Sequence, residues 1–186
     1  GRQRGLDVKT SQETLAPLFK AERGKLNWYC LDFWGRTLEL DIPTIKAGYT
    51  EGIRWRPQAE TFLRHLQASH LDVVMITNAH PLTLDMKAEQ LPLAQWFDAM
   101  ISSHQYGAPK ETPTFWDALM TERPFDPQRT LFVDDSEYVL DSAQEFGIAH
   151  LLTLRQPDSS LPVRLTTRFP AIHHFEEILD GLPDID

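Results

Sequence analysis

The sequence predicts an α/β protein in which a parallel sheet is covered by helices. From residue 71 onward, four short apolar runs rich in Val, Ile and Leu alternate with segments that have helical spacing. Uninterrupted apolar runs of this length are typical of strands that are buried on both faces, as in parallel sheets. The 186 residues, 41% of them hydrophobic, are sufficient for one core and a small additional element.

The predicted strands and helices alternate regularly along this part of the chain. The predicted strands are residues 71–77, 98–104, 130–135 and 148–154. The predicted helices between them are residues 81–92, 112–121 and 137–146. Gly147 is suited to end the last of these helices, because glycine adopts the left-handed conformation without steric cost. After Pro157 we expect a loop and a final helix near residues 175–179.

The first 56 residues show helical spacing and no strand pattern. A short amphipathic helix is predicted around residues 15–19, and most of the aromatic stretch 26–40 is predicted to be helical. Pro57 stands where the first turn of a further helix tolerates proline, and apolar residues follow on one face of that helix. We therefore expect a helical region over 1–56 and the α/β region over 57–186.

The net charge of −9 argues against a general surface for nucleic acids or anionic membranes, since both require clustered Lys and Arg. The single cysteine, Cys30, excludes an intrachain disulfide and is expected to be a small buried thiol. No apolar run approaches the roughly 18 residues that span a bilayer. These features predict a cytoplasmic protein without a membrane partner. They do not predict an oligomeric state.

Polar residues follow the predicted strands, where parallel sheets bind ligands. Thr77 and Asn78 end the first strand, and Lys110 lies in the loop after the second. The Thr77 hydroxyl and the following backbone amides, beginning with that of Ala79, are suited to phosphoryl oxygens. Taken singly, an Asn in a turn or a solvated Lys is ordinary, so the hypothesis of a phosphate site depends on their combination.

Asp134 and Asp135 end the third predicted strand. Adjacent carboxylates repel each other unless a cation neutralises them, and Mg²⁺ prefers carboxylates, waters and phosphate oxygens. Lys110 is a second candidate for this neutralisation. The alternative is that Asp135 or Ser136 only caps the following helix.

The aromatic and histidine residues have less specific interpretations. Trp28, Tyr29 and Trp34 are expected to be helix-packing residues, although one of them could contact a substrate. His80 is expected to be a loop histidine bonded to the backbone, with substrate contact as the alternative. His173 and the histidine after it have no Cys or carboxylate at metal-ligand spacing.

The order Thr-Asn, then Lys, then Asp-Asp resembles motifs two, three and four of the haloacid dehalogenase superfamily. Within that superfamily, the chain resembles the bacterial purine 5′-nucleotidases that act on GMP and IMP. The segments that carry this resemblance are LNWYCLDFW, ITNAHP, SSHQYGAPKE and RTLFVDDSE. The resemblance extends from about Leu26 to Pro157.

The resemblance implies a haloacid dehalogenase-like core preceded by a partial helical cap. It implies a Mg²⁺-dependent phosphatase whose substrate is a small phosphomonoester, a purine nucleotide. By this resemblance Thr77 binds the transferring phosphoryl group, Lys110 stabilises a phosphoaspartyl state, and the Asp134-Asp135 pair holds the magnesium ion.

One motif of the superfamily, Asp-x-Asp-Gly-Thr, is absent from these residues. In that motif the first aspartate attacks phosphorus and the second exchanges protons with the substrate. Asp32 begins a segment with similar spacing, but Trp34 stands in place of the second aspartate and cannot exchange a proton. The preceding residues also have helical spacing, and in the resembling nucleotidases this stretch belongs to the cap. We therefore do not expect Asp32 to be the nucleophile.

The missing motif also has a consequence for stability, because its strand lies in the middle of the sheet. Four buried aliphatic side chains at about 1.5–3 kcal/mol each contribute roughly 6–12 kcal/mol. This is comparable to the whole stability of a domain, about 5–15 kcal/mol. We expect that an N-terminal segment is missing from these residues or that another element fills the central position. The chain by itself is expected to be inactive.

Two alternative functions remain at this point. The first is a catalytically silent binding module that keeps the fold without the nucleophile. The second is a receiver domain of a signalling protein, which also combines an Asp pair, a Thr and a Lys around Mg²⁺. Receivers place the acidic pair early and the Lys last, whereas here the acidic pair comes last.

Overall fold

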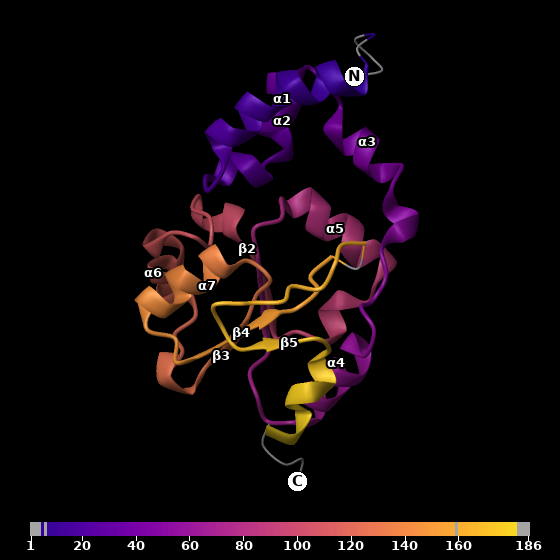
Figure 1. The fold of residues 1–186 in the computed structure, drawn as a ribbon. Helices are drawn as coiled ribbons and strands as arrows, with labels where there is room; N and C mark the ends of the chain where they lie inside the picture. Colours follow the sequence, from indigo (N-terminus) through magenta and orange to yellow (C-terminus); the bar gives the residue numbers. More distant parts are fainter. Residues whose placement is uncertain (1–4, 6, 159, 182–186) are drawn as a thin grey trace.

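All strands among the described residues are parallel, and they form two sheets instead of one (Figure 1). The computed structural model describes residue 5, residues 7–158 and residues 160–181. The first sheet contains β1 (Val74–Thr77) and β2 (Ala99–Ser102). The second has the order β3-β4-β5, with bounds Leu131–Val133, His150–Leu154 and Ala171–Ile172. The four predicted strands are confirmed, each in shortened form.

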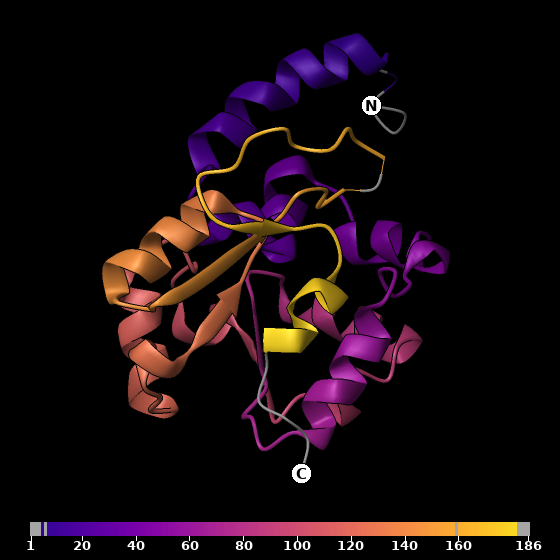
Figure 2. The ribbon, with the colours of Figure 1, turned by 60° about the horizontal axis from the view of Figure 1, so that its bottom comes forward.

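Helices cover the strands from two sides. Their bounds are α4 (Ala59–Ala68), α5 (Pro81–Gln90), α6 (Pro113–Glu122) and α7 (Glu137–Phe146), with a 3-10 helix η4 at Leu93–Gln95 and another, η6, at Pro127–Arg129. Figures 1 and 2 both show α6 and α7 on one side of the strands and α4 on the other. These helices confirm the predicted α/β pattern. Gly147 ends α7 with a φ of 110°, as its position predicted.

Three details differ from the sequence-based expectations. Pro57 lies in the turn before α4, so the helix begins two residues later. The predicted strand 98–104 ends at Ser102, whose side chain caps the 3-10 helix η5 (Ser103–Tyr106). The predicted final helix is a 3-10 helix, η7 (Phe175–Gly181). In the last two cases local hydrogen bonds of 3-10 type replace the expected regular structure.

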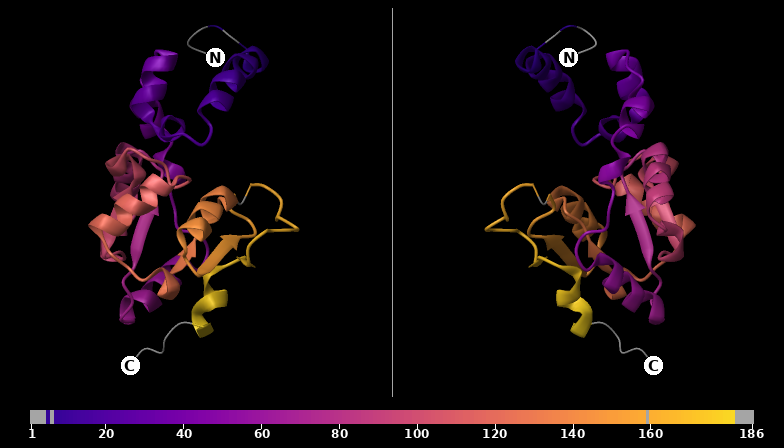
Figure 3. Two further views of the ribbon diagram at one scale, coloured as in Figure 1. Left: turned by 90° about the vertical axis from the view of Figure 1, so that its left-hand side faces the viewer. Right: turned by 90° about the vertical axis from the view of Figure 1, so that its right-hand side faces the viewer.

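The described residues before α4 form helices joined by short turns and contain no strand. The helices are α1 (Val8–Glu22), η2 (Leu26–Tyr29), α2 (Leu31–Leu38), α3 (Ile42–Ala47) and η3 (Thr50–Gly52). Figures 1 and 3 show α1, α2 and α3 grouped at one end of the molecule, away from the sheets. The two predicted helices are confirmed, whereas α3 was not predicted. A domain boundary after residue 56 stays a prediction. Among the described helices, none is both long and apolar enough to cross a membrane.

The two sheets share one hydrophobic core. Ile101 of β2 and Leu151 of β4 belong to the same cluster of buried side chains. The most deeply buried members come from α6 and α7. They are Phe115, Trp116, Val139, Leu140 and Ala143, each with at most 1% of its surface exposed. The core therefore joins the two sheets through the helices packed on them.

A large cleft lies between the sheets. Its volume is about 1600 Å³, and its lining includes Val74–Thr77 of β1, Leu131–Val133 of β3 and Leu151 of β4. The described strands pair in the orders β1-β2 and β3-β4-β5, so β1 and β3 do not pair with each other. The cleft is where we expected the central strand of the sheet.

We predict that Leu140→Ala lowers the free energy of unfolding by about 2–5 kcal/mol, because it opens a cavity in a fully buried position. Leu165→Ala is the matched control, since Leu165 is 93% exposed, and its effect is expected to stay within about 0.5 kcal/mol. Urea unfolding followed by circular dichroism measures both values. Equal effects of the two substitutions would contradict this assignment of the core.

Candidate active site

A pocket of about 630 Å³ lies between the N-terminal helices and the carboxyl ends of the strands. Its size is within the usual range of small-molecule sites. All six residues that the sequence singled out line this pocket. They are Thr77, Asn78, Ala79, Lys110, Asp134 and Asp135. The expectation that these residues come together at one edge of the strands is confirmed.

The end of β1 forms a tight polar turn. The backbone amide of Ala79 donates to the Thr77 hydroxyl at 3.1 Å. On the other side of the turn, the Ser102 hydroxyl at the end of β2 donates to the Ala79 carbonyl at 2.7 Å. The two neighbouring strands thus hold the turn in place, with the Thr77 hydroxyl and the Ala79 amide at the pocket.

Asn78 is buried and organises the loop that carries Lys110. Its side-chain oxygen accepts a hydrogen bond from the Lys110 backbone amide at 2.9 Å, and its side-chain nitrogen donates to Glu111 at 2.8 Å. The carbonyl of Lys110 accepts from the buried indole of Trp116 at 2.9 Å. Both backbone groups of Lys110 are therefore satisfied by side chains. Asn78 therefore does more than start a turn, because its side chain joins the end of β1 to the loop that carries Lys110.

The side chain of Lys110 forms a buried ion pair with Asp134. The two side chains are 9% and 8% exposed, and the Lys110 ammonium donates to Asp134 Oδ2. The same nitrogen lies 3.5 Å from the Ile76 carbonyl and 5.7 Å from the centre of the Phe132 ring. The prediction that Lys110 neutralises the acidic pair is confirmed for Asp134. The pair also links β1, through Ile76, to the end of β3.

The acidic pair has one buried and one exposed member. Burial raises the pKa of the Asp134 carboxyl, and the Lys110 ammonium opposes this shift. Asp134 Oδ1 accepts from the Ser136 amide at 2.9 Å, whereas Asp135 is exposed. Ser136 makes no side-chain capping bond to α7, so capping does not explain this residue. Carboxylate oxygens at the rim of a pocket fit the ligand preference of Mg²⁺.

A hydrogen bond across the pocket ties the N-terminal helices to the strands. The Tyr29 hydroxyl at the end of η2 donates to Glu111 Oε1. Burial raises the pKa of Tyr29, and the neighbouring Glu111 carboxylate raises it further, so the hydroxyl stays protonated as a donor. Glu111 also accepts from Asn78 and thus connects this contact to the Lys110 loop. No sequence pattern indicated a role for Glu111, although it directly follows Lys110.

The aromatic residues of the N-terminal helices pack against each other and line the pocket. Phe19 makes edge contacts with Trp28 and Trp34, with ring centres 5.7 and 4.9 Å apart. The Trp34 indole donates to the Trp28 carbonyl at 2.9 Å. The helix-packing interpretation is confirmed for Trp28 and Trp34, whereas Tyr29 bonds Glu111. The rings of Phe19, Trp28 and Trp34 all belong to the pocket wall.

Asp32 lies in the first turn of helix α2, so its segment is helical as predicted. Its carboxylate is 60% exposed, and Oδ2 lies 3.7 Å from His80 Nε2. His80 caps α5 by accepting from the Leu82 amide at Nδ1, which confirms a histidine bonded to the backbone. Asp32 does not end a strand in this structure.

Comparisons with known proteins agree with this geometry. A profile of haloacid dehalogenase-like hydrolases matches residues 30–147. The chain is 33% identical over 182 residues to a protein named GMP/IMP nucleotidase YrfG from Escherichia coli K12, covering 98% of this chain and 82% of that protein. The protein of the same name from Shigella flexneri matches with the same identity and coverage.

Solved structures with similar folds come from phosphatases and dehalogenases. A haloacid dehalogenase-type phosphatase from Thermococcus onnurineus has a TM-score of 0.77 and 17% identity, covering 97% of this chain and 83% of its own. The L-2-haloacid dehalogenase from Xanthobacter autotrophicus has a TM-score of 0.62 and 17% identity, with coverages of 97% and 91%. At these identities the comparison establishes the fold.

We predict that Tyr29→Phe loosens the contact between the N-terminal helices and the strands. A hydrogen bond to a charged group contributes about 1.5–3 kcal/mol, and its loss from a half-buried site is expected to make opening about tenfold more frequent. Amide hydrogen exchange in α2 measures this change. Tyr49→Phe is the control, because Tyr49 is 79% exposed. Unchanged exchange in Tyr29→Phe would contradict the proposed connection.

Proposed function

The chain belongs to the haloacid dehalogenase-like hydrolases, and on that premise we propose that it is a Mg²⁺-dependent phosphatase that hydrolyses purine nucleoside 5′-monophosphates. The observation that carries the proposal is the buried Lys110–Asp134 pair beside Thr77 at one pocket. A buried cation next to hydroxyl and amide donors suits a phosphoryl group. This arrangement supports acting on a phosphate ester.

In the proposed complex, the phosphoryl oxygens contact three groups of this chain. The Ala79 amide donates to the Thr77 hydroxyl at 3.1 Å. When substrate binds, a phosphoryl oxygen would replace the Thr77 hydroxyl as the acceptor of this amide. The Lys110 ammonium stabilises the negative charge that develops on the transferring group. Because Asn78 and Trp116 hold the Lys110 backbone, the ammonium is positioned before substrate binds.

Asp134 and Asp135 are the proposed ligands of the magnesium ion. Asp135 is exposed at the pocket, and Asp134 is buried with one oxygen on Lys110. When bound, the ion supplies positive charge to the phosphoryl oxygens. The carboxylates themselves orient toward the same pocket as Thr77, which supports a shared site for metal and phosphate.

We propose that the nucleophile is an aspartate on a strand in the cleft between β1 and β3. The carboxylate would attack phosphorus and form a phosphoaspartyl group, while the P–O bond to the nucleoside breaks and its oxygen takes a proton from the second aspartate of the same motif. Water would then attack phosphorus and give a proton back to that second carboxylate, which releases inorganic phosphate and restores the first carboxylate. Among the described residues that line the pocket, the only carboxylates are those of Asp134 and Asp135. Stable fluoroberyllate capture by the full-length protein would support this proposal, and its absence would favour a silent binding module.

The proposed purine substrate rests on the relatives named as GMP/IMP nucleotidases and on the pocket wall. Phe19, Trp28 and Trp34 provide aromatic surface on the N-terminal side of the pocket. Aromatic rings stack favourably on nucleobases, whereas the opposite wall carries the phosphate-binding groups. A nucleotide would therefore lie with its base toward the helices and its phosphate toward the strands.

We predict that the full-length protein releases phosphate from GMP or IMP with Mg²⁺, and that Lys110→Ala lowers this rate at least about 100-fold. Lys9→Ala is the control, because the side chain of Lys9 is 86% exposed. Lys110→Ala leaves the buried Asp134 carboxylate without its ion-pair partner, which could destabilise the fold. Circular dichroism therefore checks that this variant remains folded. Absence of phosphate release from a broad panel of phosphomonoesters would exclude the proposed function.

We further predict that Asp135→Asn raises the Mg²⁺ concentration for half-maximal activity at least about tenfold, because it removes a carboxylate charge from the metal site. Asp85→Asn, on the exposed face of α5, is the matched control. Phosphate release measured over a range of Mg²⁺ concentrations gives both values. The same Mg²⁺ dependence in both variants would remove Asp135 from the proposed site.

A further inference from the structure

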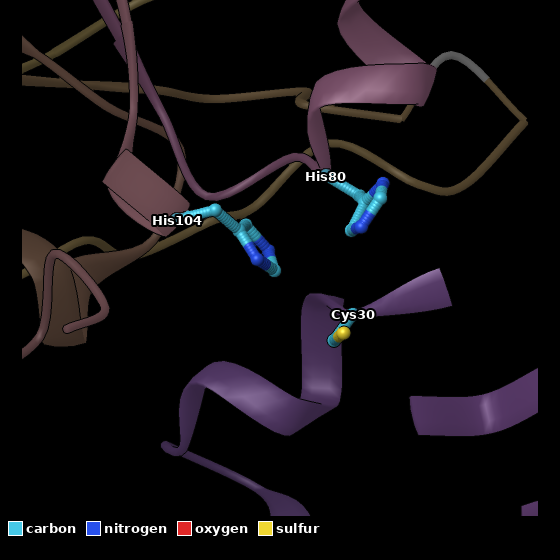
Figure 4. Close-up of side chains that lie close together, drawn as sticks. All are labelled: Cys30, His80 and His104. Carbon is cyan, nitrogen blue, oxygen red and sulfur yellow. The ribbon is translucent and has the colours of Figure 1, made fainter. Parts of the chain in front are cut away.

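A second group of possible metal ligands lies at the junction between the N-terminal helices and the strands. The ligand atoms of Cys30, His80 and His104 are all within 4.8 Å of one another. Figure 4 shows the two imidazole rings side by side with the Cys30 sulfur facing them from the neighbouring ribbon. These residues come from three separate parts of the chain: the start of α2, the start of α5, and η5.

Each of the three side chains has an atom available to a metal ion. His104 Nε2 is buried and has no hydrogen-bond partner in the structure. His80 Nδ1 accepts a long hydrogen bond of 3.4 Å from the Leu82 amide, so coordination through Nε2 requires the ring proton to move to Nδ1 and this bond to be given up. The Cys30 sulfur accepts from the Phe33 amide at 3.4 Å in the first turn of α2. Cysteine binds metals as the thiolate and releases its proton on binding.

We propose that Cys30, His80 and His104 form a zinc site that joins the N-terminal helices to the strands. A thiolate with two imidazoles is a ligand set that Zn²⁺ prefers, whereas Mg²⁺ prefers oxygen ligands. The site is therefore chemically distinct from the Asp134-Asp135 pair. An unpartnered buried imidazole nitrogen, which is costly without a partner, is satisfied when it binds the metal.

The geometry fits zinc after a small closing movement. Bonds of about 2.3 Å to sulfur and 2.0–2.1 Å to nitrogen in a tetrahedral site place the ligand atoms roughly 3.3–3.6 Å apart. The three groups lie within 4.8 Å, so they need to approach one another by up to about 1.5 Å. A water molecule, or the Asp32 carboxylate, which lies 3.7 Å from His80 Nε2 but outside the group of three, would complete the coordination.

Zinc at this position would restrict movement of the N-terminal helices. Cys30 and Asp32 belong to those helices, whereas His80 and His104 follow β1 and β2. His80 also lines the candidate active site. Binding would thus hold the wall of that pocket against the strands, in addition to the Tyr29–Glu111 hydrogen bond.

Titration of the full-length protein with Co²⁺ as a probe for Zn²⁺, in excess Mg²⁺, tests the proposal. We expect a thiolate-to-cobalt charge-transfer band and the strong visible bands of a tetrahedral site, both displaced by Zn²⁺. Cys30→Ser keeps an oxygen that can cap α2, and it should abolish the charge-transfer band. His104→Gln should weaken Zn²⁺ binding more than about 100-fold, since even residues outside the coordination sphere contribute 10–100-fold.

His70→Gln is the matched control, because His70 is exposed and lies outside the cluster. It should bind Co²⁺ and Zn²⁺ like the unchanged protein. Zn²⁺ should also slow amide hydrogen exchange in α2 of the unchanged protein and not in Cys30→Ser. The proposal is overturned if the protein fails to bind Zn²⁺, or if Cys30→Ser and His104→Gln bind it as tightly as the control. Neither outcome depends on phosphatase activity.

Discussion

The buried ion pair between Lys110 and Asp134 is the interaction on which the arrangement of this protein depends. Removing one partner of such a pair leaves an uncompensated buried charge and typically costs about 3–5 kcal/mol. Each partner is therefore held in place by further contacts. Asn78 and Trp116 bond the backbone of Lys110, and the Ser136 amide bonds Asp134. The pair joins the end of β3 to a loop that is fixed on β1, across two sheets that do not pair with each other.

The hydrophobic core and the polar site are joined through Trp116. The core surrounds Trp116, whose ring packs among buried side chains while its indole nitrogen donates to Lys110. Packing of α6 against α7 therefore positions the loop that carries Lys110 as well as stabilising the fold. The cleft between β1 and β3 interrupts the sheet at the point where the polar residues gather.

The N-terminal helices contact the strands through polar groups that line or border the pocket. The Tyr29–Glu111 hydrogen bond lies on one part of this junction, and the cluster of Cys30, His80 and His104 lies on another. Polar contacts of this kind can open at modest cost, because water replaces the lost partners. The pocket lies between the N-terminal helices and the strands, so opening of this junction would widen access to it. The junction is thus suited to movement, whereas the Lys110–Asp134 pair is suited to rigidity.

The sequence by itself determined the alternation of strands and helices and the residues that follow the strands. Apolar periodicity is a local property, so the four strands and the helices between them were predictable. The gathering of Thr77, Lys110 and Asp134 was also predictable, because the carboxyl ends of parallel strands share one edge. The helix α3 also has local sequence signals, because Asp41 caps it and proline lies in its first turn.

Only the tertiary structure decided the remaining features. The two-residue strand β5 has too short a pattern to be recognised, and its pairing with β4 defines it. The contact between Tyr29 and Glu111 joins residues 82 positions apart, and the ligand atoms of Cys30, His80 and His104 meet without any sequence spacing that indicates a metal site. Distances between side chains on separate elements follow from packing of the whole chain, which local sequence patterns do not encode.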